Sequence, residues 1–72
     1  MHFEDIIKTI KQRREALQVT QEKLAELSGV GLRTLKHLES GKGNPTLLTM
    51  QKIADVLGME LCLKIKNLTV IR

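Results

Sequence analysis

The chain has 72 residues and a formal net charge of +4 at pH 7, which is enough for one small domain and suits a polyanionic partner without requiring one. Its single cysteine, Cys62, cannot close a disulfide within the chain, and no signal peptide or membrane-length apolar run is recognisable, so a cytoplasmic protein is expected. Phe3 is the only aromatic residue, which disfavours binding of single-stranded nucleic acid, because that relies on bases stacking on rings.

The first predicted helix covers about residues 3–17. Its apolar residues fall near one stripe at helical spacing, and they are Phe3, Ile6, Ile7, Ile10 and Leu17. Charged and amide side chains fill the opposite side. We therefore expect this helix to bury one face. Residues 18–20 link it to the next helix.

A second, shorter helix is predicted to start at Thr20, whose hydroxyl can accept a backbone N–H at a helix start. It ends at Gly29, because glycine is the residue best suited to a left-handed helix end. The residues expected to face inward are Leu24, Ala25 and Leu27.

The third predicted helix runs from about residue 32 to 39 and stops at Gly41, with Leu35 and Leu38 facing inward. Two helices of roughly eight residues that cross steeply over a short turn with glycine form a helix-turn-helix. In this motif the second of the two helices lies in the DNA major groove.

A fourth helix follows a turn-rich loop over residues 41–45. Thr46 can cap its start, and Gly58 marks its end, so it covers about residues 47–57. Its predicted inward stripe consists of Leu47, Met50, Ile53, Ala54 and Leu57.

Beyond this helix the pattern changes from helical spacing to strict alternation. Over residues 60–66, Leu61, Leu63 and Ile65 fall on one face and polar residues or Cys62 on the other. A period of two predicts a half-buried strand. Residues 68–71 either extend this strand or form a second short one after Asn67.

A lone strand cannot satisfy its own backbone. If Asn67 does not turn the chain back, the simplest partner is the same strand of a twofold-related copy, running antiparallel. The sequence therefore predicts a homodimer with a two-stranded sheet between subunits. Leu48 and Val56 on the fourth helix are not needed by its inward stripe and are expected to face the partner too. The alternative is a tail that packs on its own subunit or is partly disordered.

Many short motifs over residues 6–58 fall in one register. They are Thr20-Gln21, Leu24-Ala25, Gly29-Val30, Leu35 with Leu38, Glu39-Ser40-Gly41-Lys42, Asn44-Pro45-Thr46, Ile53-Ala54 and Leu57-Gly58. Together they resemble the Cro/repressor-type (XRE-like) helix-turn-helix DNA-binding domains. The resemblance implies a compact all-α, four-helix domain over residues 1–58, and the alternation beyond it predicts a C-terminal strand and tail for dimerisation over residues 59–72.

The tail departs from the phage repressors, which usually close the domain with a fifth helix. Four helices and a C-terminal strand, with Leu-Gly-Met-Glu-Leu-Cys-Leu leading into it, are more similar to the HipB-type antitoxins. Those are dimeric autoregulators that also bind a cognate toxin.

The motif brings a set of candidate DNA-binding residues together: Gln21, Gly31, Leu32, Arg33, Thr34, Lys36, His37, Lys42 and Asn44. Arg33 is the best candidate for base readout, because a guanidinium can pair with guanine O6 and N7; otherwise it is solvated or on a phosphate. Leu32 is expected to be exposed and either packs on a thymine methyl or is an ordinary surface leucine. Gln21 either holds a phosphate or is a polar helix-start residue.

Thr34, Lys36, Lys42 and Asn44 are expected near phosphates, with local capping as the alternative for Thr34. His37 aligns with a base-contacting position of the family, which implies a hydrogen-bond donor, and otherwise is an unremarkable surface histidine. No metal site is expected around it, because no ligands stand at metal spacing.

Gly31 departs from the family pattern, which usually has Ser, Thr or Asn there as a cap and phosphate donor.

Arg14 and Glu39 match the family's internal ion pair, which ties the first helix to the end of the third. The alternative is two unrelated surface charges. Arg13 is either solvated or faces a phosphate.

The function predicted from these features is that of a dimeric transcriptional regulator, expected to act as a repressor, that reads a palindromic double-stranded DNA operator and binds no cofactor. A narrower version is the autoregulating antitoxin of a toxin–antitoxin pair. The alternative is a protein–protein adaptor of the same fold without DNA binding. An enzyme is not expected, because the chain has no paired-carboxylate site, no Ser/His/Asp set and no glycine-rich phosphate loop.

Overall fold

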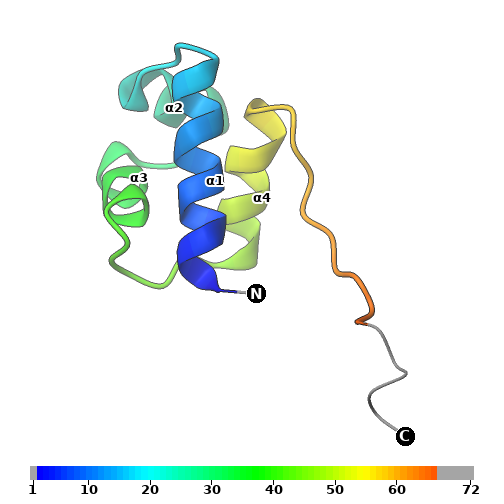
Figure 1. The fold of residues 1–72 in the computed structure, drawn as a ribbon. Coiled ribbons are helices and arrows are strands. Elements are labelled where there is room, and N and C mark those ends of the chain that lie inside the picture. The colour runs from blue at the N-terminus through cyan, green and yellow to red at the C-terminus, as the bar shows by residue number, and fades with distance from the viewer. Residues whose placement is uncertain (1, 67–72) are drawn as a thin grey trace, which may run out of the picture.

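The computed structural model describes residues 2–66 and contains four helices in that range. They are α1 (Phe3–Ala16), α2 (Gln21–Ser28), α3 (Leu32–Glu39) and α4 (Leu47–Val56). α2 packs against both α3 and α4, and α1 packs against α3, while the chain after α4 runs away from the helices (Figure 1). The predicted all-helical domain is confirmed.

Local capping explains where α2 and α4 begin. The Thr20 hydroxyl accepts a hydrogen bond from the Lys23 N–H at 3.0 Å, and the Thr46 hydroxyl accepts one from the Thr49 N–H at 3.1 Å. Each hydroxyl satisfies a backbone donor that the first helical turn leaves without a partner. α2 ends at Gly29 with φ 75°, a left-handed conformation that glycine adopts without steric cost.

All four helices contribute to one apolar core. Its centre consists of Leu24, Leu35 and Ile53, whose exposed fraction is 0%. Around them lie Ile7, Ile10, Ala25, Val30, Leu38, Met50 and Leu57. Each fully buried aliphatic side chain of this size stabilises the fold by about 1.5–3 kcal/mol.

Several residues predicted to be inward are exposed instead. Leu27 is 55% exposed. The buried face of α2 is centred on Leu24 and Ala25, and Leu27 lies outside this face. Leu47 is 73% exposed, because it is the first residue of α4 and lies beyond the edge of the core. Phe3 and Leu17, at the two ends of α1, are partly exposed for the same reason.

Arg13 joins α1 to the end of α4, a contact that the sequence left undecided. Its Nε donates a hydrogen bond to the Leu57 carbonyl oxygen at 2.9 Å. This carbonyl belongs to the C-terminal end of α4, where acceptors lack helical partners and a cation is favoured. Arg13 therefore has an internal structural contact.

The tail makes no strand within a single chain over its described part. Met59 packs against the core, but Leu63 and Ile65 are 95% and 87% exposed. A strand requires hydrogen bonds to a second strand, and residues 2–66 contain none. The second short strand predicted over residues 68–71 lies outside the described residues.

The two α4 residues assigned to a partner surface differ in exposure. Leu48 is 59% exposed, whereas Val56 is half-buried and packs against the core.

Within residues 2–66, no helix is both long enough and apolar enough to cross a membrane.

The burial difference between two leucines of α2 is testable. Leu24→Ala is expected to lower the free energy of unfolding by about 2–5 kcal/mol, because it leaves a cavity in the core. Leu27→Ala, the matched control on the same helix, is expected to change it by less than about 0.5 kcal/mol. Urea denaturation followed by circular dichroism measures both. Equal losses would contradict the core described above.

Candidate nucleic-acid interface

A buried network of charged and polar side chains holds α3 in place. Arg14 donates from Nε to Glu39 Oε2 at 2.7 Å and from Nη2 to Glu39 Oε1 at 2.9 Å. The Gln21 amide donates to Glu39 Oε1 at 3.0 Å, and Arg14 Nη1 donates to the Val19 carbonyl at 2.7 Å. The network therefore connects α1, the start of α2 and the end of α3.

Burial makes this ion pair different from a surface pair. The side chains of Arg14 and Glu39 are 11% and 2% exposed. Hydrogen bonding to Glu39 raises the pKa of Arg14 above its ordinary value. A two-pronged guanidinium–carboxylate contact has one preferred geometry, so it fixes the angle between α1 and α3 as well as joining them.

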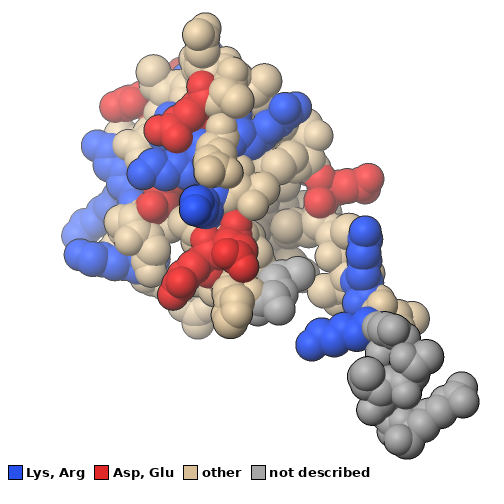
Figure 2. Space-filling model, in the orientation of Figure 1, with Lys and Arg blue, Asp and Glu red and all other residues tan. Residues whose placement is uncertain are grey.

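The network also removes a negative charge from the surface of α3. Glu39 is the only acidic residue of this helix, and Arg14 neutralises it inside the fold. Arg33, Thr34, Lys36 and His37 are all exposed. Figure 2 shows Lys and Arg side chains along the edge of the molecule where α3 lies in Figure 1. The outer face of α3 therefore combines positive charge with hydrogen-bond donors.

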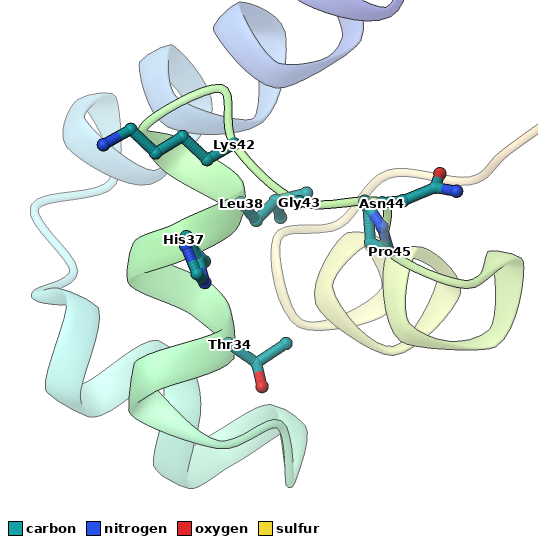
Figure 3. A pocket seen from close by; sticks show the side chains of 7 residues that line it. All are labelled: Thr34, His37, Leu38, Lys42, Gly43, Asn44 and Pro45. Carbon is teal, nitrogen blue, oxygen red and sulfur yellow. The ribbon is translucent and has the colours of Figure 1, made fainter.

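A depression of about 170 Å³ lies between α3 and the loop that follows it. Thr34 and His37, on successive turns of α3, form one wall, and the loop supplies Lys42 and Asn44 (Figure 3). The structure thus brings four of the candidate residues to one surface. Hydroxyl, imidazole, ammonium and amide groups can all donate hydrogen bonds to an anionic oxygen.

Two candidate residues differ from their expected state. Leu32 is half-buried and packs against the core, so the expectation of an exposed leucine is wrong. It is the first residue of α3, and the side chain of a helical residue leans toward the chain that precedes it. Gln21 uses one amide hydrogen internally on Glu39, which leaves the other for an external acceptor.

Gly31 is the N-cap of α3 and provides no side-chain cap. Its φ of −59° and ψ of 142° are available to any L-residue. A Cβ atom built there would meet only Thr34 Oγ1, at 3.8 Å. The glycine is therefore not required by the backbone, and the first N–H groups of α3 have no side-chain acceptor of their own.

Two internal contacts could not have been found from sequence. The Arg13 partner is a backbone carbonyl 44 residues away, which leaves no signal in side-chain type or spacing. The Gln21 contact with Glu39 spans 18 residues. The position of Gln21 at the start of a helix indicated only a polar residue that could hold a phosphate.

Comparison with known proteins gives one family. A model of the helix-turn-helix family matches residues 10–63 of this chain. An uncharacterized HTH-type transcriptional regulator of Methanothermobacter thermautotrophicus is 43% identical over 51 residues, which cover 71% of this chain and 74% of that protein.

Two further relatives also carry names of transcriptional regulators. An uncharacterized HTH-type transcriptional regulator of Archaeoglobus fulgidus is 42% identical over 52 residues, covering 72% of this chain and 73% of that protein. The cryptic phage CTXphi transcriptional repressor RstR of Vibrio cholerae is 39% identical over 56 residues, or 74% of this chain. The match spans only 50% of the length of that repressor.

The buried ion pair predicts a large effect from a single substitution. Glu39→Ala leaves the Arg14 guanidinium buried without its anion, so we expect the free energy of unfolding to fall by about 3–5 kcal/mol. Glu26→Ala is the matched control, because it removes the exposed Lys23–Glu26 pair, whose side chains are 55% and 70% exposed. That change is expected to stay below about 1 kcal/mol.

An apolar double variant separates loss of charge from loss of shape. Arg14→Met/Glu39→Met removes both charges and keeps much of the volume, so it should recover most of the stability lost in Glu39→Ala. If thermal denaturation shows the double variant to be no better than the single one, an unpaired buried charge is not the cause.

The lack of a side-chain cap at the start of α3 predicts a stabilising substitution. Gly31→Ser adds a hydroxyl cap and removes backbone freedom from the unfolded chain, so the free energy of unfolding should rise by about 0.5–1 kcal/mol. Gly29→Ser is the matched control with the opposite sign, because φ 75° there costs a serine about 1–2 kcal/mol. Thermal denaturation of both variants measures this difference in sign.

Proposed function

The chain belongs to the XRE-type helix-turn-helix family, and on that basis we propose that it is a transcriptional repressor that binds palindromic double-stranded DNA as a dimer. The observation that carries this proposal is the outer face of α3, which holds Arg33, Lys36 and His37 exposed while its one carboxylate is buried in an ion pair. Such a face can approach a polyanion without a repulsive charge on the same helix.

Base readout is assigned to the start of α3. In helix-turn-helix proteins the N-terminal residues of the second helix contact base edges in the major groove. Arg33 is exposed there and can pair with guanine O6 and N7. Only the outward part of Leu32 can meet a thymine methyl, since the rest packs on the core.

Phosphate contacts are assigned to the residues around α3. Thr34, His37, Lys42 and Asn44 line the depression beside the loop, and their donors suit phosphate oxygens. His37 keeps its alternative role at a base edge. Lys36, the Gly31 backbone and the second amide hydrogen of Gln21 complete the proposed contact surface. Contacts of this kind position the helix and make binding sensitive to salt.

The dimer is assigned to the tail and to α4. Residues 1–58 form the proposed DNA-binding unit and residues 59–72 the dimerisation unit. Leu61, Leu63 and Ile65 alternate along the tail, and Leu48 is exposed on α4; Val56 lies partly within the core. A twofold axis would set the two α3 helices against half-sites about 34 Å apart.

The relatives support regulation rather than catalysis, because their names are those of transcriptional regulators and a repressor. We propose a cytoplasmic protein whose function requires no cofactor. The HipB-type version adds a cognate toxin as a partner. The feature that supports it is the exposed tail after α4, and copurification of a second protein tests it.

Selection of binding sites from random duplexes at two salt concentrations tests the function directly. We expect a palindrome with half-sites one helical turn apart and an affinity that falls steeply with salt. Arg33→Ala should lose discrimination at one base pair of each half-site, by about 1–3 kcal/mol, while Lys42→Ala should weaken all sequences alike and flatten the salt dependence.

Lys52→Ala is the control, since Lys52 is exposed on α4 and outside the proposed contact surface. Gel-shift titrations with the selected site and with a mismatched site measure all three variants. A purified chain that binds no duplex at low salt would favour the protein–protein adaptor. A uniform loss for Arg33→Ala would remove its base-reading role.

A further inference from the structure

Two adjacent arginines of α1 bind the C-terminal ends of two different helices. Arg14 Nε donates to Glu39, the last residue of α3, at 2.7 Å. Arg13 Nε donates to the carbonyl oxygen of Leu57, the C-cap residue of α4, at 2.9 Å. Successive residues of a helix point about 100° apart, so one turn of α1 can reach both sides. α1 therefore connects the ends of α3 and α4.

The bond from Arg13 is the only link of its kind in the described part of the chain. Within residues 2–66, no other hydrogen bond joins α1 to α4 or to its C-cap. Arg13 takes part in neither ion pair of these residues. Its cationic group instead meets the end of a helix, where the last carbonyls carry partial negative charge. The direction of this bond therefore depends on one carbonyl of the backbone.

The tail leaves α4 through a turn at Gly58, directly after the carbonyl that Arg13 binds. Gly58 has φ 70°, and Arg13 Nη2 lies 3.5 Å from the position that a Cβ atom would take there. Within the turn, the Met59 N–H donates to the Ala54 carbonyl at 2.9 Å. Glycine allows many backbone conformations, so such a turn can act as a hinge unless a contact from another element holds it. Arg13 supplies this contact.

We propose that Arg13 is a positioning residue for operator recognition. It fixes the direction in which the tail leaves the helices, and thereby sets the half-site spacing that the dimer accepts. The inference rests on the proposed function, because it requires a dimer joined through the tail. Figure 1 shows the tail leaving on the side of the molecule away from α3. A small rotation at Gly58 is therefore amplified across the width of the domain before it reaches α3.

A rigid connection between two DNA-binding units makes their binding sensitive to half-site spacing. When the connection matches the separation of the half-sites, the second unit binds at a high effective concentration, and a mismatch removes that advantage. A flexible connection lowers the best affinity and accepts a wider range of separations. Adding one base pair between half-sites moves them apart by about 3.4 Å and rotates one by about 35°. Spacing preference therefore reports the rigidity of the turn at Gly58.

Two substitutions of equal charge isolate the hydrogen bond of Arg13. The amide nitrogen of glutamine follows Cδ, as Nε does in arginine, so Arg13→Gln keeps a donor at the same point along the side chain. Arg13→Met has similar length and no donor. Both variants lose one positive charge. A difference between them therefore measures the bond to the Leu57 carbonyl and not the charge.

Gel-shift titrations of palindromes with half-sites moved by one base pair test the positioning role. For the wild-type chain and Arg13→Gln, we expect the dissociation constant to rise about tenfold from the best spacing to the next, and for Arg13→Met less than about threefold. A duplex with one half-site should bind all three proteins equally. Equal spacing profiles of Arg13→Met and the wild-type chain would overturn the inference, as would equal profiles of the two variants.

The single half-site also tests the other role that the sequence left open for Arg13. A phosphate contact would weaken both variants on every duplex and flatten the salt dependence of binding. That result would overturn the positioning role, because the charge and not the bond to Leu57 would then be the cause.

Amide hydrogen exchange of the free protein gives a measurement without DNA. Opening of the turn at Gly58 breaks the Met59 N–H bond, so Arg13→Met should exchange this amide about tenfold faster than the wild-type chain, and Arg13→Gln nearly as slowly as wild type. The Leu24 N–H, which donates to the Thr20 carbonyl at 2.9 Å, is the control and should stay unchanged. An equal rise at Leu24 would indicate general loss of stability and would overturn the inference.

The two experiments separate this inference from the proposed function. A wild-type chain that binds no palindrome at any spacing overturns the proposed function, and the positioning of the tail is then judged by the exchange of Met59. If the wild-type chain and both variants bind palindromes with the same sharp spacing preference, the proposed function stands and only the role of Arg13 fails.

Discussion

The contact between Arg14 and Glu39 is the constraint on which the candidate site depends. It joins α1 to the end of α3, and Gln21 adds the start of α2 to the same carboxylate. Apolar packing alone would allow α3 to roll by a fraction of a turn on the core. A two-pronged ion pair in a largely buried position is directional, so it holds one rotation of the helix.

That rotation decides which residues of α3 serve the core and which serve a ligand. Leu35 and Leu38 are buried, and Arg33 and Lys36 are exposed on the same helix. The ion pair also removes the carboxylate of Glu39 from the exposed face. One interaction therefore sets the direction of the face and keeps a negative charge off it, and both properties matter for contact with phosphates.

The tail differs from the helices, because its exposed apolar side chains have no core to pack into. A domain of this size gains only a few kcal/mol from a single core. An apolar groove beside α1 and the exposed Leu63 and Ile65 are surfaces that a second copy can bury together. In the proposed dimer, that contact would both stabilise the fold and set the distance between two copies of α3.

The sequence alone determined the local features of this protein. Helical spacing and the cap residues Thr20, Gly29 and Thr46 placed the helices, since these depend on neighbours a few residues away, and the motif register indicated the family. Only the tertiary structure decided that Leu27 and Leu47 are exposed, that Arg13 binds the Leu57 carbonyl and that Gln21 binds Glu39. Those outcomes depend on where distant helices end and cross, and spacing along one segment carries no record of that geometry.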